Sequence, residues 1–404
     1  GQGGRPRSLA ESLRRPIFLI SKLSEYENNP MKYRLSFFAC LLLWSISDFT
    51  YAAVEDEAPS TGTQLTLEDL RTFTDVFNQL RTNFVDEVDD HTLLVAAIDG
   101  MISRLDPWSA FLEPQQSQLM DDSAKGRYGG IGIGVDTRDG RIYVQSVYPG
   151  GPADSAGMKA GDMILEVEGR PVRGRRMTDS LDALSGEPGT EVRVRFKSVG
   201  QSSREVVLER EYILISSVDH EMLGDGKAYF RISHFHRNTH VELEQAIAGA
   251  NEEAGGALKG IILDLRGNPG GVILPAVSMA DGFLDDGMIV YTQGRYEASL
   301  LEFRAEPGQW ASGVPVVVLV DANTASASEV FAGALQDHGR AIILGEKTFG
   351  KGSIQSIFNL RNGSMLKLTT AHYFTPLGRT IHNNGIEPDV AGTSAPGAIE
   401  FDGS

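Results

Sequence analysis

The sequence predicts a mixed α+β protein of several domains: an N-terminal helical region, a small β-rich domain and an α/β domain with a buried sheet. Three successive patterns along the 404 residues support this. Apolar residues recur at threes and fours up to about residue 120, short alternating runs broken by Gly and Pro follow, and nearly continuous apolar runs occupy the last part. The length is consistent with two or three domains.

The amino-acid composition argues against one class of binding partner. The chain is 41% apolar, enough for packed cores, and carries a formal net charge of −17. This acidic balance argues against a nucleic acid as partner, because phosphate binding needs clustered Lys and Arg.

The N-terminal part is typical of a targeting segment. Met31 opens a short basic region, an apolar run follows over residues 35–46, and Thr50-Tyr51-Ala52 supplies small residues for cleavage. We therefore expect a signal peptide over residues 31–52, preceded by an upstream extension over residues 1–30. An uncleaved anchor is the alternative, although the apolar run is shorter than the roughly 20 residues of a membrane helix.

The only cysteine, Cys40, lies in the middle of this apolar run, where a lipoprotein signal would not place it. Cleavage after Ala52 would leave no disulfide and no thiol nucleophile. We expect an exported protein, in the periplasm of a Gram-negative bacterium, with membrane association as an alternative.

A polar linker is predicted over residues 53–63 and a helical region over residues 64–125. In this region apolar residues have helical spacing over Leu67–Leu80 and again over Leu93–Ile102. Leu105–Leu112 ends the helical part with a turn.

The small β-rich domain is predicted over residues 126–211. Its short β-type runs are Ile131–Val135, Arg141–Val147, Met163–Val167, Val192–Phe196 and Arg204–Leu208. A helix is predicted between the third and fourth runs, over Met177–Leu184.

The α/β domain is predicted over residues 212–390, and residues 391–404 have the composition of a tail. Apolar runs predict buried strands, followed by a helix, a further strand and a hairpin: Gly260–Leu265, Val316–Val320, Ala325–Gln336 (the helix), Ala341–Leu344, and Ile354–Leu360 with Met365–Thr370.

Common nucleophile and metal motifs are absent from the sequence. There is no Gly-x-Ser-x-Gly and no His-Glu-x-x-His. His234, His236 and His240 cluster, but without a nearby acidic ligand pattern, so we interpret them as a solvated strand face rather than a metal site. We predict no metal and no cofactor.

Lys351 stands between Gly350 and Gly352. The run Gly345–Gly352 nearly matches a P-loop, but Gly352 replaces the Mg²⁺-binding Ser or Thr, and a strand-like run follows instead of a helix. A Lys packed closely in an apolar setting has a lowered pKa and can act as a general base. A surface Lys in a glycine turn is the alternative.

Two further segments carry polar or glycine-rich turns after buried strands. Asp321–Glu329 places Ser326 and Ser328 at a strand-to-helix turn, near helix amides that stabilise negative charge. Helix capping by Ser328 is the alternative. Asp264–Gly271 ends another strand with a turn whose amides are candidates for an oxyanion hole.

Together these segments resemble the carboxyl-terminal processing (tail-specific) serine peptidases. The match lies in Asp264–Gly271, the Ser-Ala-Ser-Glu run from Ser326, and the Thr-Phe-Gly-Lys-Gly-x-x-Gln run from Thr348. Lys351 lies 25 positions after Ser326, as in the family, whereas Ser328 would give 23.

The resemblance implies roles for individual residues. Ser326 matches the nucleophile, Lys351 the general base and Gln355 the residue that holds this Lys. The amides of Ala327 and of Gly270 or Gly271 match the oxyanion hole, and the matching role of Asp337 is structural. The resemblance spans about residues 65–390 and includes a closing motif over residues 376–389. It also includes Leu105–Ser109, where Trp108 stands in place of the more usual His. Thr324 stands where a Ser is common in the family.

The β-rich domain resembles a PDZ domain of the bacterial permutation. Its carboxylate-binding loop would be formed by Gly130, Ile131, Gly132 and Ile133, and the ordered Gly-rich runs over residues 149–164 fit the same domain. Such a loop captures a peptide's C-terminal carboxylate while the peptide adds a strand to the sheet edge.

We therefore expect a serine endopeptidase with a Ser/Lys dyad that cleaves exported proteins near free C-termini. A catalytically inactive PDZ adaptor that binds protein C-termini is the alternative, and the intact Ser326, Lys351 and Gln355 argue against it. The resemblance also implies a helical-repeat adaptor lipoprotein and homo-oligomerisation as candidate associations.

Overall fold

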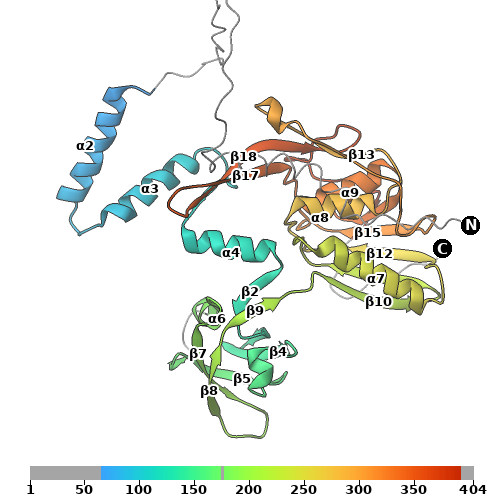
Figure 1. Cartoon of the computed structure of the whole chain (residues 1–404), viewed down its shortest axis with the longest axis horizontal. Helices are drawn as coiled ribbons and strands as arrows, with labels where there is room; N and C mark the ends of the chain where they lie inside the picture. The colour runs from blue at the N-terminus through green and yellow to red at the C-terminus, as the bar shows by residue number, and fades with distance from the viewer. Residues whose placement is uncertain (1–64, 174–176, 393–404) are drawn as a thin grey trace, which may run out of the picture. The chain divides into compact units, whose positions relative to one another are not determined.

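The computed structural model describes residues 65–173 and 177–392, which are coloured in Figure 1. The predicted extension (1–30), signal peptide (31–52), linker (53–63) and most of the predicted tail (393–404) lie outside the described residues. Within the described ranges, no helix has both the length and the apolarity that a membrane crossing requires.

The N-terminal region forms the two predicted helices, α2 (Leu67–Asn83) and α3 (Asp90–Ile102). Asp89 caps α3, because its side chain accepts hydrogen bonds from the backbone N–H groups of His91 and Thr92. A third helix, α4 (Pro114–Ala124), was not predicted. It begins with Pro at its first turn, where a missing N–H has no cost.

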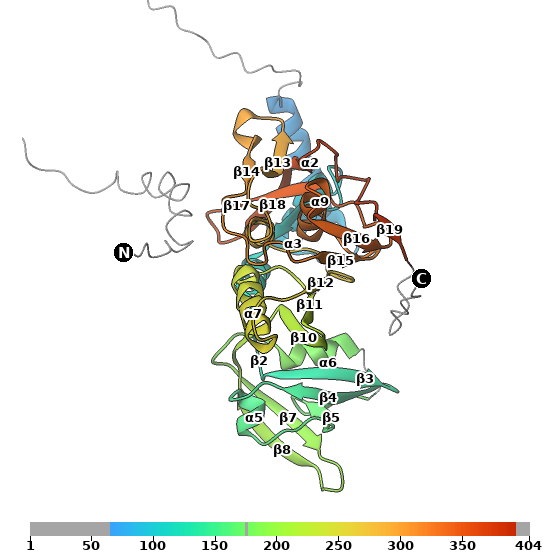
Figure 2. The same ribbon diagram turned by 90° about the vertical axis from the view of Figure 1, so that its right-hand side faces the viewer.

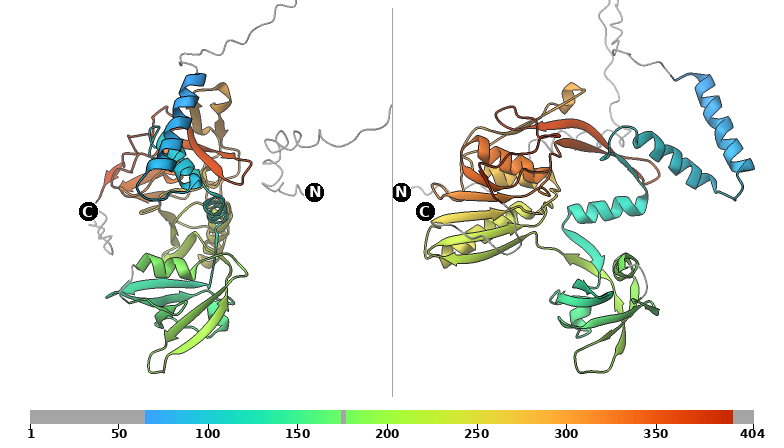
Figure 3. Two further views of the ribbon diagram at one scale, coloured as in Figure 1. Left: turned by 90° about the vertical axis from the view of Figure 1, so that its left-hand side faces the viewer. Right: turned by 180° about the vertical axis from the view of Figure 1, so that it is seen from behind.

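The β-rich domain is one antiparallel sheet in the order β3-β4-β5-β7-β8, with β6 paired to β5. Its strands and helices are β3 (Ile133–Arg138), β4 (Arg141–Val147), α5 (Pro152–Ser155), β5 (Met163–Val167), β6 (Arg170–Pro171), α6 (Met177–Leu184), β7 (Glu191–Lys197) and β8 (Arg204–Glu209). Alternate residues, such as Val192, Val194 and Phe196 of β7, are completely buried. This green segment is compact in both views of Figure 3.

The predicted small β-rich domain is present, and it also contains α5 and β6, which were not predicted. The first strand begins at Ile133, whereas Ile131 lies in the preceding loop and is buried. A separate two-stranded ribbon, β2 (Arg127–Gly130) and β9 (Glu211–Leu214), connects this domain to the chain before and after it.

The α/β domain has a six-stranded sheet in the order β10-β11-β12-β15-β16-β19 (Figure 2). Only β10 and β11 are antiparallel, and the other neighbours are parallel. Its elements are β10 (Val218–Gly224), β11 (Lys227–Ile232), α7 (Thr239–Glu253), β12 (Gly260–Asp264), α8 (Ile273–Asp281), β15 (Val316–Val320), α9 (Ala327–Asp337), β16 (Ala341–Gly345) and β19 (Val390–Ala391). The crossovers β11 to β12, β12 to β15 and β15 to β16 contain α7, α8 and α9, whereas β17 (Ser353–Asn359) and β18 (Met365–Phe374) lie between β16 and β19.

A second sheet in the order β1-β18-β13-β14, with β17 also paired to β18, completes this part. Its strands are β1 (Ala110–Leu112), β13 (Met288–Gly294), β14 (Glu302–Arg304), β17 (Ser353–Asn359) and β18 (Met365–Phe374). The predicted hairpin is confirmed as β17 and β18. The pairing of β1 with β18 brings the chain around Trp108 into this sheet, although it is more than 250 positions away in sequence.

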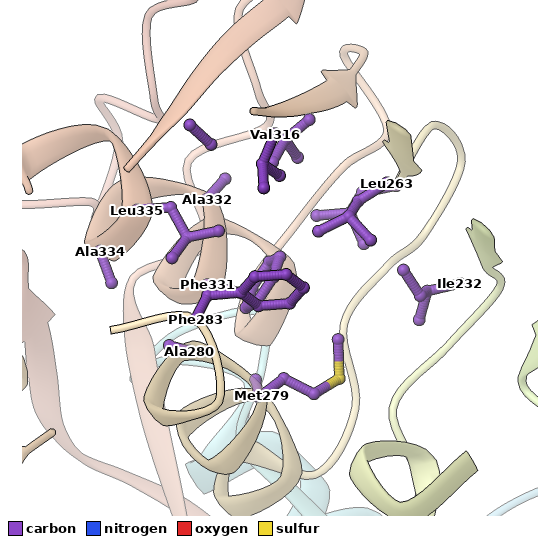
Figure 4. Close-up of a cluster of buried hydrophobic side chains, with 14 of the residues drawn as sticks. Ile232, Leu263, Met279, Ala280, Phe283, Val316, Phe331, Ala332, Ala334 and Leu335 are labelled. Carbon is purple, nitrogen blue, oxygen red and sulfur yellow. The ribbon is translucent and has the colours of Figure 1, made fainter. Parts of the chain in front are cut away.

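The main core lies between the six-stranded sheet and helices α8 and α9. Phe331 of α9 packs edge-on against Phe283, with ring centroids 6.1 Å apart, and both are completely buried (Figure 4). Burying such aromatic rings stabilises the fold strongly. Packing against this core fixes the position of α9, and the predicted nucleophile, Ser326, directly precedes this helix.

Candidate active site

Three predicted segments meet at one edge of the α/β sheet. Strands β12, β15 and β16 are parallel neighbours, so their carboxyl ends lie side by side. The turn over residues 267–271 follows β12, Ser326 follows β15, and Lys351 follows β16. Ligands bind at this edge in open α/β sheets, because the connecting loops diverge there.

The first two loops are joined by hydrogen bonds. Asn268 O accepts one from Ala325 N (3.0 Å) and another from the hydroxyl of Ser328 (3.2 Å). Asp321 accepts one from Gly267 N (3.0 Å), and Thr324 Oγ1 donates to Leu265 O (2.9 Å). Ser328 is completely buried, and its hydroxyl group therefore stabilises the contact between the two loops.

Ser326 is half-buried and directly precedes α9. Its backbone has φ 57° and ψ −117°, in a region that non-glycine residues rarely adopt. Such strain persists only when the surroundings enforce it, and it is concentrated at functional sites. Here the result is a sharp turn that places the serine between a buried strand and a helix N-terminus.

A single buried carboxylate enforces this turn. Glu329 is completely buried and accepts hydrogen bonds from Ser326 N (2.7 Å), Lys351 N (2.9 Å), Gly350 N (2.7 Å) and the hydroxyl of Thr348 (2.6 Å). Burial raises the pKa of Glu329, and these hydrogen bonds oppose the rise. The backbones of the candidate nucleophile and base are thus fixed to the same side chain.

Lys351 is half-buried, and its ammonium group lies over the ring of Trp108, with Nζ 4.5 Å from the ring centroid. Burial lowers the pKa of Lys351 and the charge of Lys367 lowers it further, whereas Glu329 acts in the opposite direction. In the described ranges no hydrogen bond joins Lys351 Nζ to Ser326 Oγ.

The glycine on one side of Lys351 has a steric role. A Cβ at Gly352 would lie 2.3 Å from the backbone N of His382, closer than real Cβ atoms approach. The predicted close packing around the lysine is therefore found.

Gln355, the residue expected to hold the lysine, bonds elsewhere. Its Nε2 donates to Ser353 Oγ (2.9 Å) and Thr369 Oγ1 (3.2 Å), and the described contacts include no hydrogen bond to Lys351. Asp337 lies at the end of α9, where it accepts from Leu377 N (2.8 Å) and pairs with the guanidinium of Arg379.

The glycine turn distinguishes between the two candidate amides. Gly270 N donates to Asn268 Oδ1 (2.9 Å), whereas the amides of Gly271 and Ala327 donate to no other group in the part of the chain that the structure describes. Gly270 instead permits close approach, since a Cβ there would lie 2.8 Å from Ser326 Cβ.

The interpretation of the histidine cluster is wrong. His236 is only 2% exposed and its Nε2 lies 3.3 Å from Glu242, while His240 lies in the first turn of α7. A strand pattern does not apply because the chain leaves β11 at Ile232 and turns into a helix. Among the described residues, no group of three or more potential ligands could hold a metal ion.

The β-rich domain contains an apolar groove of about 180 Å³ between β3 and α6. It is lined by Tyr128, Ile131, Ile133, Val135, Leu181, Leu184 and Ser185. Strand β3 is an edge strand, so one side of it is open to pairing with a peptide. Gly132, at φ 76°, makes the turn that leads from Gly130 into this strand.

Two site residues were missed by sequence reasoning. Glu329 enters the sequence analysis only as the end of the Ser-Ala-Ser-Glu run, although a Glu three residues after a serine at a helix start is the signal of a capping box. Trp108 was noted as a departure from the family pattern, but nothing in the sequence places it beside Lys351.

Comparison with known proteins gives three family matches. The model of peptidase family S41 matches residues 226–391, that of a PDZ domain residues 143–198, and that of the activating protease CtpB N-terminal domain residues 36–116.

Individual relatives agree with these matches. A carboxy-terminal-processing protease of Bartonella bacilliformis is 38% identical over 329 residues, 81% of this chain and 76% of that protein. Carboxy-terminal processing protease CtpA of Bacillus subtilis is 34% identical over 78% of this chain and 67% of its own. The solved photosystem II D1 C-terminal processing protease is 31% identical, with a TM-score of 0.47, over 81% of this chain and 94% of that one.

Proposed function

Because the chain belongs to the carboxy-terminal processing proteases of peptidase family S41, and is therefore a serine-type peptidase with a PDZ domain, we propose that it is an endopeptidase whose dyad is Ser326 and Lys351. The observation that carries this proposal is the convergence of the Ser326 and Lys351 backbones on Glu329. A nucleophile and a base held by a common group have the fixed geometry that covalent catalysis needs.

The reaction would proceed by acyl transfer. Neutral Lys351 accepts the proton of Ser326 Oγ as this oxygen attacks the peptide carbonyl, and the carbonyl electron pair moves onto its oxygen. The amides of Gly271 and Ala327 stabilise the oxyanion, since neither donates to another group among the described residues. Ala327 directly follows Ser326, and Gly271 belongs to the glycine turn that approaches Ser326. Gln355 would stabilise the productive position of Lys351 from β17.

The PDZ groove would recognise the free C-terminus of the substrate. A peptide paired with the open edge of β3 would place its last apolar side chain in the groove and its carboxylate near the amides of Gly130–Ile133. The same proposal includes export, with cleavage of the signal peptide over residues 31–52. It also includes association of the protein with an adaptor lipoprotein and with further copies of itself. No cofactor is part of it.

Replacement of the two neighbouring serines tests the nucleophile. Ser326→Ala should abolish cleavage of a peptide with a free apolar C-terminus, because no other group there can form the acyl intermediate. Ser328→Ala should keep most activity and lose about 1 kcal/mol of stability, since one buried hydrogen bond is removed. Turnover is measured by mass spectrometry and folding by thermal unfolding.

The two outcomes separate the competing assignments. An active Ser326→Ala with an inactive but folded Ser328→Ala would reverse the assignment of the nucleophile. Peptide binding without cleavage by the wild type would favour the inactive PDZ adaptor. EDTA in the same assay should have no effect, since no step uses a metal.

A further inference from the structure

Trp108 is the aromatic residue that contacts the candidate base. Lys351 Nζ lies 4.5 Å from the centroid of the Trp108 ring, within the range of a cation–π interaction. The ring of Phe349, two residues before the lysine, packs edge-on against the same indole, with centroids 6.0 Å apart. The indole therefore covers the lysine loop from a segment distant in sequence.

Several hydrogen bonds hold Trp108 in this place. Asp106 Oδ1 accepts from Trp108 N (2.7 Å) and from Ser109 N (2.8 Å), which closes a tight turn. Ser109 Oγ in turn accepts from Thr369 N of β18 (3.0 Å), and the next residues pair with β18 as β1. The indole is thus fixed to the sheet that also carries the strand after Lys351.

We propose that Trp108 is a positioning residue for Lys351, an inference that rests on the proposed Ser/Lys dyad. The indole face holds the amine beside the site and stabilises the ammonium formed when the proton of Ser326 Oγ passes to Lys351 Nζ. A ring attracts the charged ammonium more strongly than the neutral amine. The contact is therefore stronger after proton transfer than before it, and such differential binding accelerates the step.

The two charged groups that act on the pKa of Lys351 lie outside the tryptophan segment. Glu329 of α9 and Lys367 of β18 act on Lys351 with opposite signs. Both remain in any variant of Trp108. A change in the titration of Lys351 on altering the indole can therefore be assigned to the ring.

The test uses the full chain with fluorinated tryptophans incorporated at position 108 alone. Each added fluorine weakens the cation–π attraction while leaving the shape of the ring nearly unchanged. We expect the plateau value of kcat/KM for a fixed peptide, reached above the pKa of Lys351, to fall stepwise, with a total loss of about 3- to 30-fold. The midpoint of the rise of kcat/KM with pH should move to lower pH in the same order, because the ammonium loses stabilisation. A purely structural role would move neither quantity along the series.

Two substitutions extend the test. Trp108→Phe should retain more activity than Trp108→Leu, because phenylalanine keeps a weaker π face and leucine keeps only apolar cover. Trp310→Phe is the control, since Trp310 packs against Phe283 in the core, away from the lysine. It should have wild-type kcat/KM and pH midpoint once its folding is verified.

The results separate this inference from the proposed function. A folded Lys351→Ala that still cleaves the peptide would remove the dyad itself. If Lys351→Ala is inactive but the fluorinated series has wild-type rates and pH midpoints, only the role of Trp108 is rejected. Plateau values of kcat/KM that increase along the series would also overturn it, because the ring would then restrain the lysine instead of assisting it.

Discussion

At the scale of single residues, the decisive property is the charge of Lys351. An ordinary lysine has a pKa of about 10.4 and is almost fully charged at neutral pH, so it cannot accept a proton. Burial and the neighbouring Lys367 lower the pKa of Lys351, and both raise the fraction of neutral amine. In the proposed dyad, the neutral base therefore results from partial desolvation next to a second cation, and Glu329 acts in the opposite direction.

This charge state predicts a pH dependence. Activity should rise as pH rises through the lowered pKa of Lys351, because the neutral form is the active one, with a midpoint below 10.4. Lys351→Arg should be inactive across this range, since a guanidinium stays protonated. Initial rates from pH 5 to 10 test both statements. An arginine variant with a normal rate would exclude Lys351 as the base.

At the scale of elements, Glu329 connects the start of α9 with the loop that precedes β17. Four donors from these two elements converge on it, and no water is needed to satisfy them. A carboxylate has only acceptors, which suits four donors, whereas an amide would place an N–H group against one of them. The strained turn at Ser326 and the position of Lys351 therefore depend on the same side chain.

Replacement of this carboxylate should affect stability and activity together. Glu329→Gln should lower the free energy of unfolding by about 2–4 kcal/mol, because at least one buried donor loses its acceptor. It should also reduce kcat by releasing the Ser326 turn. Glu387→Gln is the matched control, because the Glu387 side chain forms an exposed ion pair with Lys347 and no other polar contact among the described residues. It should change stability by less than about 1 kcal/mol.

Chemical denaturation and initial rates give the two quantities. A Glu329→Gln variant with wild-type stability and kcat would show that the carboxylate fixes neither loop.

At the scale of the whole molecule, the proposed function divides recognition and cleavage between two domains. The β-rich domain leaves and rejoins the protease core at adjacent points, since Ile215 N donates to Gly126 O (2.8 Å). Its groove and the open edge of β3 belong to the domain itself and do not depend on the dyad. Binding of a C-terminus and peptide hydrolysis should therefore be separable by experiment.

A single peptide in acid and amide forms tests this division. The wild type should cleave the acid form faster, because amidation removes the charge that the loop amides bind. A variant in which a short linker replaces residues 127–214 should cleave both forms equally and slowly. Competition between the two peptides, followed by mass spectrometry, gives the ratio. Equal cleavage by the wild type would remove the C-terminal recognition proposal and leave the dyad unaffected.

The sequence by itself determined the elements and the candidate chemistry. Apolar periodicity is local, so it predicted α2, the PDZ strands and the buried strands β12 and β15. The spacing between Ser326 and Lys351 singled out one serine because family resemblance resides in linear motifs. Helix α4, by contrast, lacks a strong apolar period and was not foreseen.

Only the tertiary structure decided which distant groups meet. Glu329 bridges two loops, Trp108 lies over Lys351 through the pairing of β1 with β18, and the histidine cluster lies partly in the interior. It also showed that Gly270 donates to Asn268 while Gly271 does not. Each of these facts depends on parallel strand order and side-chain packing between segments far apart in the chain. Local pattern carries no information about such contacts, because its signal extends over only a few residues.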